Sequence, residues 1–161
     1  MSSSSSSGGV VCTADADHGS PTLQSPIAQD VVGAVYFSAS IDGGEDYVVL
    51  ALYPGYGAFA GGTVTTGTFE LTGEDLNYAT CGICVLLSTE YDADTGSFLD
   101  DYFATGGSVT LNSVEGNLTG SLSNVTFQQV TIDPDTYESS PHPSGCQSGI
   151  TATSFDAPIQ Q

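Results

Sequence analysis

Two cysteines separated by two residues, Cys81 and Cys84, are the part of this chain whose spacing most directly suggests chemistry. A Cys-x-x-Cys pair is a redox centre when a helix N-terminus or a nearby cation stabilises the first thiolate. Here the following residues, VLLSTEY (85–91), have the composition of a strand, and the chain has no Lys or Arg. The sequence therefore argues against a thioredoxin-like redox site.

Together with His142 and Cys146, the same pair has the residue types of a tetrahedral zinc site. The two halves of such a site lie far apart in the sequence for a zinc module, and His142 stands between two prolines. Zinc therefore stays as an alternative to a second interpretation, in which the cysteines form disulfides.

The chain has an even number of cysteines in an acidic, Ser-, Thr- and Gly-rich sequence, as is typical of exported proteins. We predict that all of them form disulfides: Cys12, Cys81, Cys84 and Cys146. A bridge between Cys81 and Cys84 would close a tight, strained loop, so we expect these two residues to pair with Cys12 and Cys146. Each bridge would then close a loop of about sixty or seventy residues. The sequence does not say which cysteine pairs with which.

An acidic segment, DADTGSFLDD (92–101), places Asp92, Asp94, Asp100 and Asp101 around Gly96. Calcium takes six to eight oxygen ligands, and carboxylates at alternating positions around a glycine are one way to supply them. The segment is not an EF-hand loop, since no Glu stands at the closing position. Calcium is the one cofactor that the sequence suggests, and an ordinary acidic hairpin loop is the alternative.

Aromatic residues cluster in LYPGYGAF (52–59), where Tyr53, Tyr56 and Phe59 surround a proline and two glycines. Such a cluster can form a platform for a sugar or a protein ligand. The alternative is core and turn packing, because a tyrosine commonly buries its ring and leaves its hydroxyl in water.

Charge is the unusual feature of the composition: the chain has 19 Asp and Glu residues and no Lys or Arg. A uniformly negative surface repels phosphate, so nucleic acids and anionic membranes are excluded as partners. A Lys nucleophile and an Arg clamp are impossible. Both histidines, His18 and His142, have turn-like neighbours. We therefore expect a protein that is not an enzyme, whose carboxylates are partnered by backbone N–H groups, water and external cations.

The elements that would position these residues are strands. Apolar residues alternate or cluster in short segments separated by Gly-rich turns, at 31–41, 47–53, 63–71, 83–91, 108–114, 117–132 and 149–155. The best helical segment is the short GEDLNYA (73–79). This pattern predicts an all-β fold, an antiparallel β-sandwich or a partly open barrel of about seven to nine strands. The segment 47–53 is apolar on both faces, which predicts a strand covered on both sides.

In the segment 117–132 the apolar alternation changes phase twice. Leu118 and Leu122 share one parity, Val125 and Phe127 the other, and Val130 returns to the first. Each change predicts a bulge or bend, near Ser123-Asn124 and near Gln128-Gln129.

The chain divides into a Ser/Gly head (1–9) and a single β domain (10–161). The head, MSSSSSSGG, has the composition of a flexible tether. It is either native, following the lipidated Cys of a surface lipoprotein, or an added linker. No apolar stretch is long enough to span a membrane, so we expect no membrane insertion of the domain.

The runs ATGGSVTLNSVEGNLTGSLSNVTFQQVTID (104–133), YATCGICVLL (78–87) and SGCQSGITATSFDAPI (144–159) resemble uncharacterised secreted or lipoprotein-type β domains of myxobacteria and related bacteria. The resemblance implies export and anchoring at the cell surface, and it carries no activity over to this chain. The complete lack of Lys and Arg departs from what such domains lead us to expect.

These observations predict an extracellular or cell-surface protein: a disulfide-bonded structural or interaction module without catalysis. Its sheet edges would support self-assembly or binding of surface proteins. The alternative is a calcium-dependent module that binds carbohydrate or protein.

Overall fold

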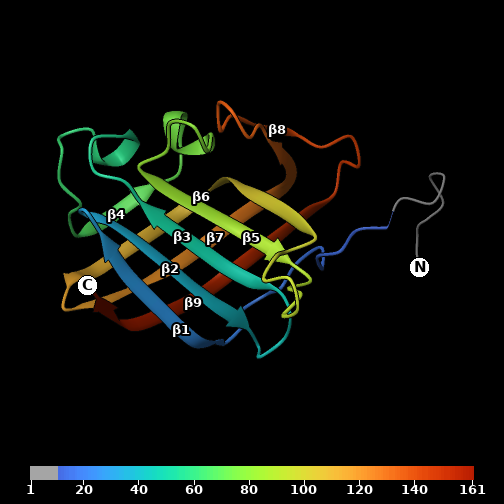
Figure 1. Ribbon diagram of the computed structural model, residues 1–161, viewed down its shortest axis with the longest axis horizontal. Helices are drawn as coiled ribbons and strands as arrows, with labels where there is room; N and C mark the ends of the chain where they lie inside the picture. The colour runs from blue at the N-terminus through green and yellow to red at the C-terminus, as the bar shows by residue number, and fades with distance from the viewer. Residues whose placement is uncertain (1–10) are drawn as a thin grey trace.

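The computed structural model describes residues 11–161, and the predicted head (1–9) lies outside them. All nine strands of the described part belong to one hydrogen-bonded sheet (Figure 1). Their bounds are β1 (Leu23–Val31), β2 (Ala34–Ile41), β3 (Tyr47–Leu52), β4 (Gly67–Glu70), β5 (Ile83–Thr89), β6 (Asp100–Glu115), β7 (Asn117–Ile132), β8 (Ser139–Pro141) and β9 (Gln147–Gln160). The all-β prediction is confirmed.

The sheet closes on itself. Its strand order is β4-β6-β5-β3-β2-β1-β9-β7-β8, and β6 pairs in addition with β7, so only β4 and β8 lie outside the ring. In Figure 1, β1, β2, β3 and β5 form the front layer and cross β6, β7 and β9 behind them. Closure removes most strand edges, and the edges that remain in the described part belong to short strands.

One seam of the ring departs from the predicted antiparallel pattern. Strand β1 runs parallel to β9, with Ala28 opposite Ile159. The segment before β1 extends this seam, because the N–H of His18 donates to the carbonyl of Gly149 and that of Thr151 donates to the carbonyl of Gly19. The N-terminal part of the chain and its C-terminal strand therefore close the ring together.

Strand β1 and the three-residue β8 are not among the predicted strands. The segment 31–41 is not one strand, because a turn at Val32 and Gly33 separates β1 from β2. Both turn residues have positive φ, 53° at Val32 and 88° at Gly33. A β-branched residue avoids that region, so the Val-Gly pair gives no hairpin signal. A side chain supports the turn: Asp30 Oδ1 accepts a hydrogen bond from the N–H of Gly33.

The interior of the ring is a single apolar core. Alternate residues of each strand point inward, and the largest fully buried side chains include Phe37, Leu50, Leu87, Tyr102 and Phe127. Each such side chain stabilises the fold by about 2 kcal/mol through burial. These inward faces hold the strands in register, because a slip of one residue would expose them.

A second, smaller cluster lies on the outside of the ring, and we call it the outer cluster. It consists of Ala51, Cys81, Cys84, Leu86 and Phe103. Every residue of β5 is buried: Cys84 and Leu86 enter this cluster, and Ile83, Val85 and Leu87 enter the core. The prediction that 47–53 is covered on both sides is supported by Ala51, which is buried in the outer cluster.

The two predicted irregularities of β7 have different outcomes. The first is confirmed: Ser123 and Asn124 are both exposed, Asn124 has a φ of 50°, and the pairing with β6 shifts nearby. The second, near Gln128-Gln129, is wrong. The alternation of inward and outward side chains continues through Gln128 and Gln129, which places Val130 and Ile132 on the outward face. They are apolar because they pack against the outer cluster.

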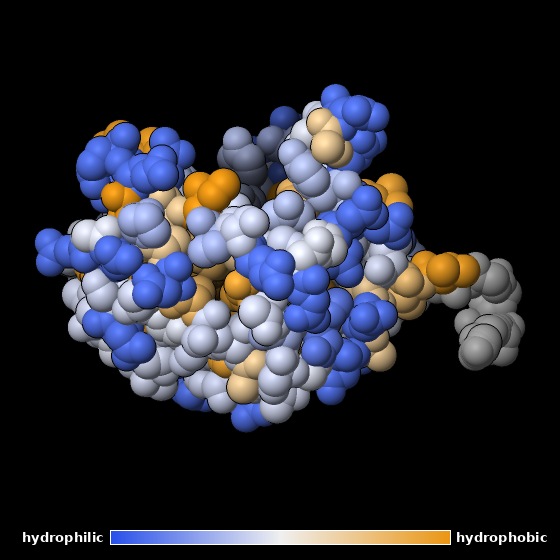
Figure 2. Space-filling view, turned by 90° about the horizontal axis from the view of Figure 1, so that it is seen from below, coloured by the Kyte–Doolittle hydropathy of each residue, from blue (hydrophilic) through white to orange (hydrophobic). Residues whose placement is uncertain are grey.

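No Lys or Arg is present to pair with the surface carboxylates, and backbone N–H groups and hydroxyls take that role. Asp17 accepts a hydrogen bond from the N–H of Gly19, Asp42 from that of Thr22, and Asp101 from the hydroxyl of Ser88. Figure 2 shows hydrophobic residues as small separate groups among hydrophilic ones on the face that it presents.

Candidate functional site

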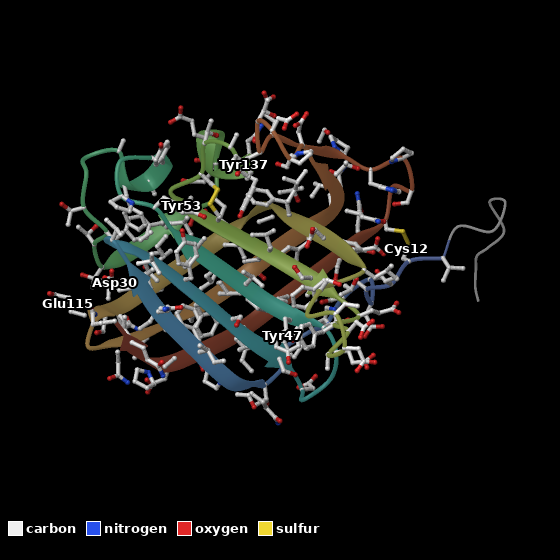
Figure 3. The ribbon with its side chains drawn as sticks, in the orientation of Figure 1. Cys12, Asp30, Tyr47, Tyr53, Glu115 and Tyr137 are labelled. Atoms are coloured by element: carbon white, nitrogen blue, oxygen red, sulfur yellow. A yellow bond between two sulfur atoms is a disulfide. The ribbon has the colours of Figure 1, made fainter. Side chains whose placement is uncertain are left out.

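A hollow lined by tyrosines lies over the outer cluster, and we call it the tyrosine hollow. Its volume is about 350 Å³, and its walls are Tyr53, Tyr56, Tyr78, Ala79, Cys81 and Tyr137. Tyr53 follows β3, Tyr56 precedes the short 3₁₀ helix η2 (Gly57–Phe59), Tyr78 follows the 3₁₀ helix η3 (Gly73–Leu76), and Tyr137 lies between β7 and β8. Figure 3 shows Tyr53 and Tyr137 on the same side of the molecule, with Tyr47 far from both.

A buried carboxylate joins two of the segments that form the hollow. Asp75 is only 5% exposed. Its Oδ1 accepts hydrogen bonds from the N–H groups of Ala58 (3.3 Å), Gly82 (2.8 Å) and Ile83 (3.1 Å). One side chain thus fixes the segment after Tyr56 to the Cys-x-x-Cys turn. Gly82 is required at this junction, since a Cβ there would collide with the carbonyl oxygen of Tyr56.

The segment between β7 and β8, which carries Tyr137, is held by hydrogen bonds that involve the side chains of Asn77 and Ser139. Asn77 Oδ1 accepts from the N–H of Ser139 at 3.3 Å and from that of Ala79 at 2.9 Å. The N–H of Tyr78 donates to Ser139 Oγ at 3.1 Å. The segment that carries Tyr137 is therefore attached to the segment that carries Tyr78, and the walls of the hollow are fixed relative to one another.

The rings of the hollow meet at steep angles. Tyr53 and Tyr56 have interplanar angle 77° with centroids 6.5 Å apart, and Tyr78 and Tyr137 have 70° at 6.5 Å. Tyr36, on β2, stands at 79° to Tyr53 with centroids 5.7 Å apart. Burial raises the pKa of Tyr53 far above its usual value of 10.0, and the neighbouring Tyr36 and Tyr78 side chains raise it further. Tyr53 is therefore a neutral hydroxyl at neutral pH.

Tyr137 has a backbone conformation that a tyrosine rarely adopts, with φ at 63°. A tight turn imposes it: the N–H of Tyr137 donates to the carbonyl of Asp133, and the N–H of Asp133 donates to the carbonyl of Glu138. Glycine or asparagine fits this region better, and a bulky residue there costs of order 1 kcal/mol. Yet the Tyr137 ring is not buried for stability, because the residue is 58% exposed.

The predicted ligand platform is partly assembled. Tyr53 and Tyr56 line the same hollow, but Phe59 does not join them. Phe59 is 2% exposed and packs in the core against Phe69, so its role is structural. Tyr78 and Tyr137 were missed. No sequence signal marks them, because they lie far from Tyr53 along the chain.

All four cysteines form disulfides, but the expected partners were wrong. Cys81 bonds to Cys84, and Cys12 bonds to Cys146. The Cα atoms of Cys81 and Cys84 are 5.3 Å apart, within the usual range for a disulfide, because the chain turns between them. The strain that we expected in so short a loop does not prevent the bond. The Cys81–Cys84 bridge forms part of the wall of the tyrosine hollow.

These pairings remove the thiolates that a zinc site would need. His142 has a structural contact instead: its Nδ1 accepts a hydrogen bond from the N–H of Ser144 at 3.0 Å. The other histidine, His18, lies with Nδ1 3.8 Å from a carboxylate oxygen of Asp15.

Three of the four aspartates of the predicted calcium site accept hydrogen bonds from different partners. Asp92 Oδ1 accepts from the N–H of Asp94, Asp100 Oδ2 accepts from the hydroxyl of Thr13, and Asp101 Oδ1 accepts from the hydroxyl of Ser88. Among residues 11–161, no group of three or more His, Cys, Asp or Glu side chains is placed to hold a metal ion. The calcium site stays a prediction from sequence.

A second hollow, the acidic hollow, lies over this loop, with a volume of about 570 Å³. Its lining includes the carboxylates of Glu45, Glu90, Asp92 and Asp94 and the rings of Tyr91 and Phe98. Tyr47, Tyr91 and Phe98 pack on one another, with centroids 5.1 to 5.5 Å apart.

Fold and site together define an all-β, disulfide-bonded domain with a tyrosine-lined hollow on the outside of a closed ring of strands. Within residues 11–161 no helix has the length and apolar character to cross a membrane. Comparisons with protein-family models, with curated proteins and with solved structures gave no match.

Proposed function

We propose that this chain is an exported interaction module that binds a ligand or a partner through the tyrosine hollow and catalyses no reaction. The observation that carries the proposal is Tyr137. Its backbone is held in an unfavourable conformation while its ring stays largely exposed. Glycine or asparagine would fit the turn better, so we infer that a tyrosine stands here because its ring has a role.

The construction of the hollow supports the same proposal. Binding sites need side chains whose positions are fixed before the ligand arrives, because ordering them afterwards weakens binding. Asp75, Asn77 and the Cys81–Cys84 bridge fix the segments that carry the tyrosines. The exposed rings of Tyr56 and Tyr137 then form the accessible part of the site.

An extracellular place of action, at a bacterial surface or in an extracellular assembly, is part of the proposal. Two disulfides are maintained in an oxidising environment, and the absence of Lys and Arg suits a surface surrounded by external cations. The resemblance of the sequence to secreted and lipoprotein-type β domains points the same way.

Association through sheet edges is the less favoured form of this interaction. In the described part, the outermost strands are β4, with four residues, and β8, with three. Edges this short offer few free backbone groups to a partner strand. We therefore expect a monomer in size-exclusion chromatography, and a concentration-dependent polymer would favour edge-to-edge assembly instead.

The test compares wild-type protein with the double variant Tyr56→Ala/Tyr137→Gly, both fluorescently labelled, on intact bacterial cells and isolated extracellular material. We expect saturable binding by the wild type and at least a tenfold loss in the variant. The matched control is Leu99→Ala, which removes an exposed side chain from the acidic hollow and should bind as wild type. Equal binding by all three proteins would overturn the proposal.

A single variant separates binding from folding. Tyr137→Gly removes the unfavourable backbone conformation, so the free energy of unfolding should not fall, while binding is lost. A clear loss of stability with unchanged binding would instead give Tyr137 a structural role.

A further inference from the structure

The tyrosine hollow has the geometry of a cage rather than of a flat platform. Its two pairs of rings stand at 77° and 70°, so the hollow presents aromatic faces in more than one direction. A sugar stacks on one flat face, whereas a compact group with C–H bonds on all sides contacts several faces at once. A volume of about 350 Å³ accommodates a small head group.

The charge of the chain selects the sign of that group. With 19 acidic residues and no Lys or Arg, the surface attracts cations and repels phosphates and carboxylates. No Lys or Arg side chain of the chain itself can compete for the ring faces. The negative face of an aromatic ring binds a cation, and this attraction strengthens as the cation leaves water.

The lining also decides which kind of cation fits. Among residues 11–161, no carboxylate or carboxamide side chain lines the tyrosine hollow, and the polar side-chain oxygens of its lining are tyrosine hydroxyls. A primary ammonium or guanidinium would find tyrosine hydroxyls there as neutral acceptors, but no carboxylate to pair with. A quaternary ammonium has no N–H group to satisfy, so contact with ring faces is sufficient for it.

We propose that the tyrosine hollow binds a quaternary ammonium group, with Tyr53, Tyr56, Tyr78 and Tyr137 as its cage. This inference rests on the proposed function and names the ligand class of the same site. The shared chemistry is the trimethylammonium head, which occurs in choline and in a trimethylated lysine side chain.

The test is isothermal titration with choline and, as the matched probe, with its uncharged carbon isostere 3,3-dimethylbutan-1-ol. The two have the same shape and differ in charge. Choline should bind saturably and at least about fivefold more tightly than the isostere, as expected for a partly exposed cation–π site. Equal affinities would show that the site recognises shape alone, and would overturn the proposal.

A peptide with one trimethyllysine, titrated beside its unmodified form, distinguishes the two sources of the head group. Whichever of choline and the modified peptide binds more tightly identifies the source, and failure of both overturns the proposal. Tyr56→Ala should weaken binding of the better ligand at least tenfold, and Tyr91→Ala, in the acidic hollow, should not.

Different results would contradict the ligand class and the proposed function. If choline and the peptide do not bind, but binding to cells or extracellular material still depends on Tyr56 and Tyr137, the ligand class is wrong and the proposed function stands. If neither kind of binding depends on these residues, the proposed function fails as well.

Discussion

The tyrosine hollow and the acidic hollow both combine aromatic rings with a surface depression, but they are supported differently. The hydrogen bonds that the buried Asp75 carboxylate accepts, and a disulfide in the wall, hold the tyrosine hollow. In the acidic hollow, Asp92 accepts a hydrogen bond from its own turn at Asp94 N–H, and the aromatic rings of the region pack against each other. The rings of the acidic hollow lie closer together, with centroids 5.1 to 5.5 Å apart, than the two tyrosine pairs of the tyrosine hollow, at 6.5 Å.

Each hollow is also linked to a different disulfide. The Cys81–Cys84 bridge closes a local turn beneath the tyrosines. The Cys12–Cys146 bridge spans 134 residues and anchors the N-terminal segment, whose Thr13 hydroxyl donates to Asp100 at the base of the acidic loop. We therefore expect global stability to depend chiefly on the Cys12–Cys146 bridge, and the geometry of the tyrosine hollow on the Cys81–Cys84 bridge.

The largest effect is expected from removing the long-range bridge. In the chain-entropy description, Cys12→Ser/Cys146→Ser lowers the free energy of unfolding by about 5 kcal/mol, because the unfolded chain gains the freedom of a very long loop. Urea unfolding followed by circular dichroism measures it. Folded protein should keep its affinity at the tyrosine hollow. A loss below about 1 kcal/mol would contradict this assignment of roles.

Removing the Asp75 carboxylate should have the next largest effect. Asp75→Ala leaves the N–H groups of Ala58, Gly82 and Ile83 without their acceptor, at a cost of about 3 kcal/mol in unfolding free energy. The matched control is Asp92→Ala, whose exposed carboxylate should cost less than about 1 kcal/mol. Equal losses in the two urea titrations would remove the contrast between the hollows.

Removing the local bridge should affect both stability and binding. Cys81→Ser/Cys84→Ser opens only a short loop, so the chain-entropy cost is about 2 kcal/mol. Because Cys81 lines the tyrosine hollow, ligand affinity should fall several-fold. The titration and the urea curve together test this. Unchanged affinity would mean that the bridge does not position the tyrosines.

High pH should reveal the environment of Tyr53. Its pKa is raised in the folded state, so the native protein holds that proton more tightly than the unfolded chain does. The resulting contribution to stability is complete below about pH 10 and is lost as the pH rises further. In a tyrosinate absorbance titration, Tyr53→Phe should remove one late-ionising group. An unchanged titration curve would contradict the burial of this hydroxyl.

Added cations should have the smallest effect on stability, and their effect tests whether the acidic hollow holds a calcium site. Because Asp92, Asp94, Asp100 and Asp101 do not converge, we expect calcium and magnesium to raise the melting temperature gradually and alike, through screening. The measurement is a thermal melt in EDTA and then with added Ca²⁺, Mg²⁺ or NaCl. A shift that saturates at stoichiometric calcium would instead favour the calcium-dependent alternative.

The sequence predicted the fold class because alternation and Gly-rich turns are local signals. It missed β1, where Ser25 has a φ of 52° and the register with β2 shifts between Gln24 and Ile27, so that the alternation is broken. It misread Val130, whose outward side chain is apolar only because the outer cluster covers it. Apolar residues on the outward face of a strand change the phase of the apolar pattern in the sequence, as a bend would.

The candidate site was predictable only where it is local. Tyr53 and Tyr56 lie three residues apart in the sequence and were predicted together. Tyr78 and Tyr137 lie far apart in the sequence, and hydrogen bonds between their neighbours Asn77 and Ser139 bring their segments together. Such contacts depend on the closed ring and on the segments folded over it. The pairing of Cys81 with Cys84 was missed for a related reason, since the turn that joins them is fixed by distant backbone contacts at Gly82.

The most direct test of the central claim is aromatic-ring NMR of the tyrosines during titration with tetramethylammonium. If the tyrosine hollow is the cage, the ring signals of Tyr53, Tyr56, Tyr78 and Tyr137 shift together and saturate, while those of Tyr47 and Tyr91 stay in place. Saturable shifts confined to Tyr47 and Tyr91, or no shift in any ring, would contradict it.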